Sequence, residues 1–590
     1  MTHDMNSIPR VQIRMGPVVA GAIVASALAL FTLFAVAHIR QPIAQDDVWY
    51  MVAAETYVET GVPENFQTRQ RLAAYNPESY LQILALSFRL FGFGEASARL
   101  IGIVSGWLAI ILIFVATHSL AQGDPAARLW WASLASGLYA LTPGLIQGVL
   151  ILSLDNTMLI PCVLLLCWAF IKHQDGGTLR WAMLVALAAA LSLWVRVTTP
   201  LVVIGCLGLY ACVRPSSLRA KVTGFAALGA GVLLFAVTWY AYAVIVTVPF
   251  NGPFTYAGQA FADKMRDLSL SSAAQTVCYL VLWAGVFPVV LLGWALAQRG
   301  WVWLCERTVF PEDALALCGL SLGIGYVCIG GAIFGFPKYH APAIPLLYVF
   351  SAVVFSKSCR ESAPIDVRQE GLALACVGVA CAVQVFTIGD WFYLLRYQIR
   401  DVLAGFAPVS YEVWSGLAVK AVLWGVGYGF LFALARRLSL PVRTLVYVCA
   451  LGSSLGVSLL QYAAEYQTGY GYGERGTVEV AQHVRARVPA DQTVIVPHEV
   501  AYYIKGRGAS YWDNSLWLDD ERLARLLAER TTSGLVYSIA TNTVSQVRTI
   551  LGSRAIQTVL QSDYAQETIG TYRVWIRSVR PRGPDRTLVK

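Results

Sequence analysis

Long apolar runs alternate with short polar links along the first 466 residues of this chain. Because a helix needs about 20 apolar residues to cross a bilayer, the runs predict about thirteen membrane-spanning helices. Residues 16–36 form the first such run, which is too long for the core of a cleavable signal and is expected to be a retained anchor. The predicted spans are 16–38, 98–120, 128–146, 156–172, 180–196, 200–214, 221–248, 274–298, 314–336, 341–357, 371–389, 413–435 and 443–464.

The segment between the first two spans, residues 40–98, is too long to be a simple connection. Apolar residues recur at helical spacing in 48–57 and 80–91, which predicts two amphipathic helices on the membrane surface. Turn-forming residues separate them at 61–65 and 75–78.

The pattern changes after about residue 467, where charged residues become common and apolar runs shorten. Residues 467–590 are therefore predicted to form a small soluble α/β domain beside a membrane domain of residues 1–466. The glycine-rich stretch 469–473 is interpreted as a linker, with a binding loop as the alternative. Predicted strands are 493–497, 534–539 and 572–576, and predicted helices are 474–488, 519–530 and 542–551.

Composition supports a membrane protein. Of 590 residues, 57% are hydrophobic and only 13% are charged, and mean hydropathy is +0.58. The net charge of +9 does not indicate nucleic-acid binding, because most Lys and Arg residues fall in short links between spans. The Cys residues show no zinc-binding spacing and are absent from the 40–98 loop.

The distribution of Lys and Arg predicts the orientation. Positive charge favours the cytoplasmic side, and the links around residues 128, 172–180, 214–221, 299–307, 357–368 and 436–443 carry most of it. The N-terminus is then cytoplasmic, whereas the 40–98 loop and the C-terminal domain are extracytoplasmic.

Two acidic residues, Asp46 and Asp47, lie at the outer end of the first span beside Trp49 and Tyr50. Asp is favoured at helix starts, so capping of the helix at 48–57 is one explanation. One Asp suffices for a cap. The other is a candidate catalytic base, because apolar neighbours raise the pKa of a carboxyl group and a carboxylate can take a hydroxyl proton.

Further candidates fall at the outer ends of later spans. Asp155 is a lone acid in an apolar stretch, which implies either a partner or a helix cap. Cations at this face suit a phosphate headgroup, although snorkelling of ordinary surface cations is the alternative. His340 alone is better explained as a histidine packed at the interface than as a metal ligand. The candidate binding residues are Arg196, Lys264, Arg266, Lys338, Tyr339 and His340.

Taken in order along the chain, several short motifs resemble those of the GT-C superfamily of membrane glycosyltransferases. Protein O-mannosyltransferases and lipid A aminoarabinose transferases are the most similar members. Only Pro77 stands where those enzymes usually have two prolines. The motifs are residues 46–50, 75–80, 87–92, 98–100, 154–156, 194–200 and 337–345.

The resemblance implies a GT-C-like polytopic α-helical fold and an inverting hexosyl- or pentosyltransferase in a membrane, expected to be the bacterial inner membrane. Its donor would be a polyprenyl-phosphate sugar, and its acceptor an extracytoplasmic lipid, glycan or protein. No cofactor is clearly required, no metal ligand is assigned, and a divalent metal remains possible. Two alternatives are a transporter or flippase of lipid-linked sugars and a non-catalytic scaffold. The implied catalytic residues are Asp46 and Asp47, and the implied substrate-binding residues are Asp155, Arg196, Lys338, Tyr339, His340 and Tyr75.

Overall fold

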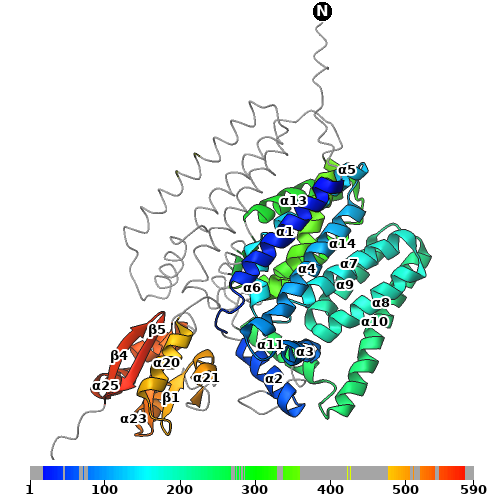
Figure 1. Cartoon of the computed structure of the whole chain (residues 1–590). Helices are drawn as coiled ribbons and strands as arrows, with labels where there is room; N and C mark the ends of the chain where they lie inside the picture. The colour runs from blue at the N-terminus through cyan, green and yellow to red at the C-terminus, as the bar shows by residue number, and fades with distance from the viewer. Residues whose placement is uncertain are drawn as a thin grey trace, which may run out of the picture.

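In the computed structural model, the N-terminal part of the chain is a bundle of apolar helices (Figure 1). The structure describes residues 17–43, 47–64, 71, 77–266, 286–328, 336–358, 476–504, 509–510, 519–538 and 544–578, with isolated positions at 273–284, 422 and 426. The long bundle helices are α1 (Pro17–Ala37), α4 (Glu95–Leu120), α5 (Pro125–Ala140), α7 (Leu159–Gly176), α8 (Leu179–Val195), α9 (Thr198–Val213), α10 (Leu218–Ile245), α13 (Val286–Glu306), α14 (Asp313–Cys328) and α15 (Ala343–Ser358).

Some of these bundle helices are long enough to span a membrane. Among the described residues, α1, α4 and α10 are both long and apolar enough to cross a bilayer, by length and composition. Helices α8, α9, α14 and α15 are apolar but shorter. Apart from positions 422 and 426, the predicted spans 371–389, 413–435 and 443–464 lie outside the described residues, so the total of about thirteen stays a prediction.

One predicted span, 128–146, is not a single helix. Helix α5 ends at Ala140, and Pro143 then begins a short buried helix, α6 (Pro143–Leu150). Proline has no N–H to continue the helical ladder, so it is favoured at the first turn of a new helix. The Thr142 hydroxyl donates to the carbonyl of Leu138 at the junction. The break directs the following loop, residues 151–158, into the bundle.

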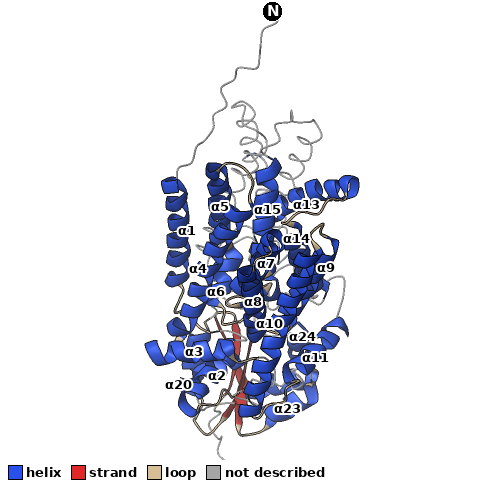
Figure 2. Ribbon diagram, turned by 90° about the vertical axis from the view of Figure 1, so that its right-hand side faces the viewer, coloured by secondary structure: helices blue, strands red, loops and turns tan. Residues whose placement is uncertain are grey.

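The links between helices gather at two ends, as the alternating topology requires. At one end, Arg99 at the start of α4 donates to the carbonyl of Leu150, and Arg196 pairs with Asp155. At the other end, the backbone N–H of Gln122 donates to Ser356, far away in sequence. Figure 2 shows the first end below and the second above. Among the described residues, the predicted outer links that contain Asp47, Asp155 and Arg196 therefore lie at one end of the bundle.

The 40–98 loop contributes two helices to the first end, α2 (Asp47–Thr60) and α3 (Ser79–Phe91). Helix α3 buries Tyr80, Leu84 and Phe88 toward the protein, and its other face exposes apolar residues such as Leu86 and Leu90. Both predicted helices are present, and α3 is amphipathic as predicted, whereas the apolar and polar residues of α2 are not separated onto two faces. After α10 the chain also forms α11 (Gly252–Arg266), which the sequence pattern did not predict.

The C-terminal region forms a mixed sheet in the order β2-β1-β3-β5-β4. Strand β1 is parallel to β2 and β3, whereas β5 is antiparallel to β3 and β4. The three predicted strands correspond to β1, β3 and β5, and the three predicted helices to α20, α23 and α24. The elements are α20 (Thr477–Arg487), β1 (Thr493–Val496), α21 (His498–Ile504), β2 (Ala509–Ser510), α23 (Asp520–Ala528), β3 (Thr532–Ser538), α24 (Val544–Gly552), α25 (Arg554–Asp563), β4 (Tyr564–Ile569) and β5 (Tyr572–Arg577).

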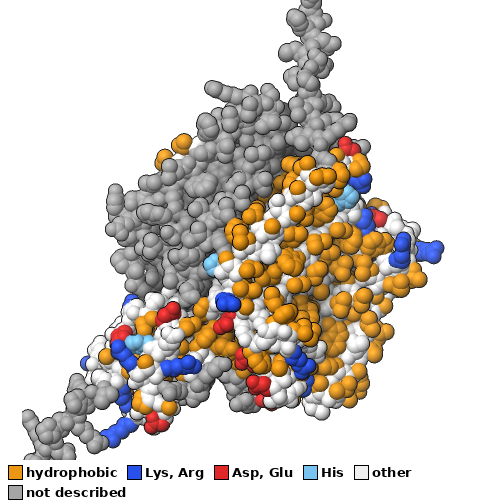
Figure 3. Space-filling view, in the orientation of Figure 1, with side chains coloured by type: hydrophobic (Ala, Val, Ile, Leu, Met, Phe, Trp, Pro, Cys, Tyr) orange, Lys and Arg blue, Asp and Glu red, His pale blue; other side chains and the backbone are white. Residues whose placement is uncertain are grey.

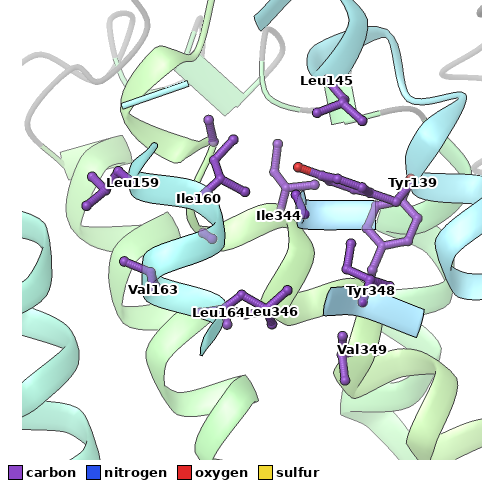
Figure 4. Close-up of a cluster of buried hydrophobic side chains, with 14 of the residues drawn as sticks. Tyr139, Leu145, Leu159, Ile160, Val163, Leu164, Ile344, Leu346, Tyr348 and Val349 are labelled. Carbon is purple, nitrogen blue, oxygen red and sulfur yellow. The ribbon is translucent and has the colours of Figure 1, made fainter. Parts of the chain in front are cut away.

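The bundle packs around a continuous apolar core. Figure 4 shows Leu164 of α7 beside Leu346 of α15, and Tyr348 of α15 against Tyr139 of α5, within one cluster of buried side chains. On the outside, apolar side chains cover the middle of one face while charged side chains lie toward its ends (Figure 3). This distribution suits a protein surrounded by lipid.

Candidate active site

Asp47 is the first residue of α2, and its side chain is almost fully buried. One carboxylate oxygen accepts a hydrogen bond from the backbone N–H of Leu152 at 2.9 Å. The other lies 3.7 Å from a guanidinium nitrogen of Arg99. Asp47 therefore joins the 40–98 loop to the loop that precedes α7. Its neighbour Asp46 lies outside the described residues.

Arg99 organises this end of the bundle and was missed as a functional candidate. Its side chain is fully buried, and it donates to the carbonyls of Leu150 at 2.7 Å and Ile39 at 3.0 Å. It also donates to the carbonyls of Gln41 and Pro42. A cation buried this deeply needs such partners. The signal in the sequence was a lone Arg at the start of an apolar run.

Asp155 and Arg196 form the second ion pair at this end, between the loop before α7 and the start of α9. Asp155 is buried, and one of its carboxylate oxygens contacts the Arg196 guanidinium. Arg196 also donates to the Thr198 hydroxyl at 2.9 Å. The predicted candidates Asp155 and Arg196 are thus brought together, and the guanidinium is held in a fixed orientation.

The segment 338–340, a short 3-10 helix η2 (Lys338–His340), lies beside this pair. The Tyr339 ring lies 4.8 Å from the Arg196 guanidinium carbon and 5.1 Å from the Lys338 ammonium nitrogen. Tyr326 of α14 stacks on Tyr339 and contacts His340 edge to face. Three further candidates, Lys338, Tyr339 and His340, therefore join the same cluster. Two cations close to one aromatic ring form a site suited to an anion.

An apolar cavity of about 250 Å³ adjoins the cluster. Arg196 and Tyr339 line it together with side chains of α9, α11 and α14, including Val202, Phe261 and Leu322. A cavity with a mostly apolar lining and a guanidinium in its wall suits an amphipathic ligand with an anionic headgroup.

Polar atoms in this cluster lack hydrogen bonds within the described part of the chain. Asp155 Oδ1 and both amide atoms of Asn156 are buried without a hydrogen-bond partner there. Buried polar groups are normally paired, and leaving one unpaired costs about 1–3 kcal/mol. These atoms are available to bind a polar ligand.

A further polar cluster near the loop was also missed. Glu78 is fully buried and accepts two hydrogen bonds from Arg71, at 3.1 and 3.0 Å. Its second oxygen also accepts from the Tyr242 hydroxyl at the end of α10. The neighbouring candidate Tyr75 lies outside the described residues, as do the side chains of Lys264 and Arg266. The arrangement fixes the turn before α3 against α10.

The sequence left open a need for a divalent metal. Within the described ranges, no group of three His, Cys, Asp or Glu side chains is placed to hold a metal ion.

Comparison with known proteins relates this site to a family. Residues 77–242 match the family model for dolichyl-phosphate-mannose-protein mannosyltransferase. This range includes Asp155 and Arg196. No curated protein sequence matches the chain significantly.

Solved structures are similar over nearly the whole chain. The crystal structure of ArnT from Cupriavidus metallidurans bound to undecaprenyl phosphate is 16% identical, with a TM-score of 0.54 over 96% of this chain and 99% of that one. The apo ArnT structure is also 16% identical and gives 0.51, over 94% and 97%. Arabinosyltransferase EmbB from Mycobacterium smegmatis is 15% identical and gives 0.42 over 76% and 41%, a likeness too weak to argue from.

Proposed function

We propose that this chain, a membrane protein of the GT-C glycosyltransferase superfamily, moves a sugar from a polyprenyl-phosphate donor to an extracytoplasmic acceptor with inversion at the anomeric carbon. The observation that carries the proposal is the Asp155–Arg196–Tyr339 cluster beside an apolar cavity. The resemblance to ArnT, whose crystal structure contains undecaprenyl phosphate, supports the same class of lipid here.

The donor lipid is assigned to the cavity and its phosphate to the cationic cluster. Part of an isoprenoid chain fits against the apolar side chains of α9, α11 and α14. The phosphate then lies near Arg196 and Lys338, which stabilise the charge that develops on it as the sugar leaves. Asp155 holds Arg196 in place. His340 packs behind Tyr326 and is assigned no chemical step.

The sugar itself is assigned to the polar atoms that lack partners. Asp155 Oδ1 accepts from a sugar hydroxyl, and the Asn156 amide can both donate and accept. Binding the sugar would satisfy these buried atoms. Tyr75, from the loop before α3, is kept as a candidate contact on the acceptor side.

Asp46 is proposed as the catalytic base. The neighbouring Asp47 carboxylate is already used by Leu152 and Arg99, so Asp47 is assigned a positioning role. An acceptor hydroxyl gives its proton to Asp46 while its oxygen forms a bond to the anomeric carbon. The bond from that carbon to the phosphate oxygen breaks, and the phosphate keeps the electron pair. Such a leaving group needs no protonation by an acid.

The test is glycosyl transfer by the full-length protein, with envelope extracts as acceptor and polyprenyl-phosphate sugars as donor, followed by mass spectrometry of the products. Loss of a general base costs about 10²–10⁴-fold in rate, so Asp46→Asn should abolish measurable transfer while the protein still folds. Glu59→Gln, an exposed change on α2, is the matched control. Full transfer by Asp46→Asn would remove Asp46 from the mechanism. Movement of a sugar lipid across vesicles without a new glycosidic bond would replace the enzyme by a flippase.

A further inference from the structure

The C-terminal region contacts the 40–98 loop through two adjacent tyrosines. Tyr502 and Tyr503 lie on α21, which directly follows β1 and packs against α2. Their rings meet edge to face, with centroids 5.2 Å apart. Both therefore project from one short helix of the C-terminal region toward the loop that contains the acidic pair.

Tyr503 uses both functions of its hydroxyl. The oxygen accepts from the backbone N–H of Ile43 at 2.8 Å, and the proton is donated to a carboxylate oxygen of Glu95 at 2.9 Å. The Tyr502 hydroxyl donates to Glu55 of α2 at 2.7 Å. Burial raises the pKa of each tyrosine, and Glu55 beside Tyr502 and Glu95 beside Tyr503 raise it further. Both phenols therefore stay protonated and able to donate.

The partners of Tyr503 lie next to the groups that hold Asp47. Ile43 is fully buried and immediately follows Gln41 and Pro42, whose carbonyls accept from Arg99. Glu95 lies one helical turn before Arg99 on α4. The chain entering the acidic pair is thus held by Arg99 from the bundle and by Tyr503 from the C-terminal region. Asp46 falls in sequence between the two held residues, Ile43 and Asp47.

We propose that Tyr503 is a positioning residue for Asp47 and for the chain segment that holds Arg99 beside it, so that the C-terminal region completes the active site of the membrane domain. The inference rests on the proposed function, because it assigns the pair a role in transfer. Tyr502 contributes less to this positioning, because its partner Glu55 lies two turns along α2 from Asp47. Small displacements of a reacting group lower the rate strongly. The hydrogen bond between Tyr503 and Ile43 is close to the acidic pair in sequence, so losing it should slow catalysis.

The decisive variant is Tyr503→Phe in the full-length protein, which removes one oxygen and keeps the ring. The matched control is Tyr564→Phe in the same region, where the lost hydroxyl donates to the carbonyls of Leu527 and Thr532, away from the loop. We expect Tyr503→Phe to lower kcat roughly tenfold or more while KM for donor and acceptor changes little. Tyr564→Phe should keep kcat close to that of the native protein.

Hydrogen–deuterium exchange gives a second readout that does not depend on activity. Tyr503→Phe should speed exchange in residues 39–47, because the Ile43 amide loses its acceptor, and should leave residues 544–563 unchanged. Unchanged kcat together with unchanged exchange would overturn the inference. An equal fall of kcat in both variants would also overturn it, since that is general destabilisation. If the native protein transferred no sugar, the proposed function would be wrong whatever Tyr503 does. Hydrogen–deuterium exchange at residues 39–47 would still show whether Tyr503 holds this segment.

Discussion

At the scale of single residues, the site depends on two arginines with different roles: Arg99 is fully buried, and Arg196 is partly exposed. Arg99 is surrounded by backbone carbonyls and Asp47, so it holds structure. Arg196 is paired with Asp155 but also lines the cavity, so it is available to a ligand. We therefore expect two different mutant phenotypes: substitution of Arg99 should reduce stability, and substitution of Arg196 should reduce donor binding.

Arg99→Met should destabilise the protein. The change removes the hydrogen-bond donor of several buried carbonyls and leaves the Asp47 carboxylate without its arginine. Breaking a buried ion pair in this way lowers the free energy of unfolding by about 3–5 kcal/mol. Thermal unfolding in detergent measures the loss. Arg89→Met, an exposed change on α3, is the control and should unfold close to the native temperature. Equal unfolding temperatures for the two variants would contradict the structural role.

Arg196→Met should instead reduce transfer activity more than thermal stability. Losing the phosphate contact should raise KM for the donor roughly tenfold or more and lower kcat. Arg196→Lys should recover part of the activity, because an ammonium keeps the charge but cannot bridge Asp155 and Thr198 as a planar guanidinium does. Arg214→Met removes a cation paired with Asp175 between α7 and α9, away from the cavity. Donor kinetics of that variant should match the native protein, and a similar rise in its KM would argue against a specific site.

Sequence reasoning reached the members of the cluster but not their contacts. Asp155, Arg196 and Tyr339 each stand out in the sequence as polar groups at the ends of predicted spans. Their pairing joins positions 41 residues apart and more, which periodicity cannot indicate. Arg99 and Glu78 belong to motifs 98–100 and 75–80 but are not singled out as site residues, because one is explained as the start of a span and the other as part of a turn. Burial is what distinguishes them, and burial follows from tertiary packing.

At the scale of elements, the close approach of α4 and α6 limits what the bundle tolerates. A Cβ added at Gly102 of α4 would lie 2.0 Å from the carbonyl oxygen of Val149 in α6, and backbone cannot move aside cheaply. The two helices have to stay close because Leu150, at the end of α6, binds Arg99.

Gly102→Ala should therefore reduce both thermal stability and transfer, as overpacking typically costs about 1–3 kcal/mol. Gly205→Ala on α9 is the matched control, since a Cβ there meets nothing within 4 Å. Alanine is the better helix former by up to about 1 kcal/mol, so this control should be neutral or slightly stabilising. Unfolding temperatures of the two purified variants decide the matter, and equal values would show that α4 and α6 can separate.

Element prediction worked where one physical pattern dominates. Apolar runs located α1, α4, α7, α8, α9 and α10 within a few residues, and short apolar runs located β1, β3 and β5. It failed at the break between α5 and α6, because the apolar pattern continues through Pro143 and hides the change of direction. It also missed α11, whose sequence is amphipathic but neither long nor strongly apolar.

At the scale of the whole molecule, the 40–98 loop and the C-terminal region form one end, joined by Tyr502 and Tyr503. The charge distribution in the sequence predicts that this end is extracytoplasmic, and the proposed reaction requires it, because donor and acceptor meet there. Single cysteines at exposed positions can test sidedness in intact cells: Glu59→Cys on α2, Gln561→Cys on α25 and Thr178→Cys before α8 at the opposite end. An impermeant thiol reagent should label the first two above the native background. It should label the third only after the membrane is opened. Labelling of Thr178→Cys alone in intact cells would place the acidic pair in the cytoplasm and remove the proposed mechanism.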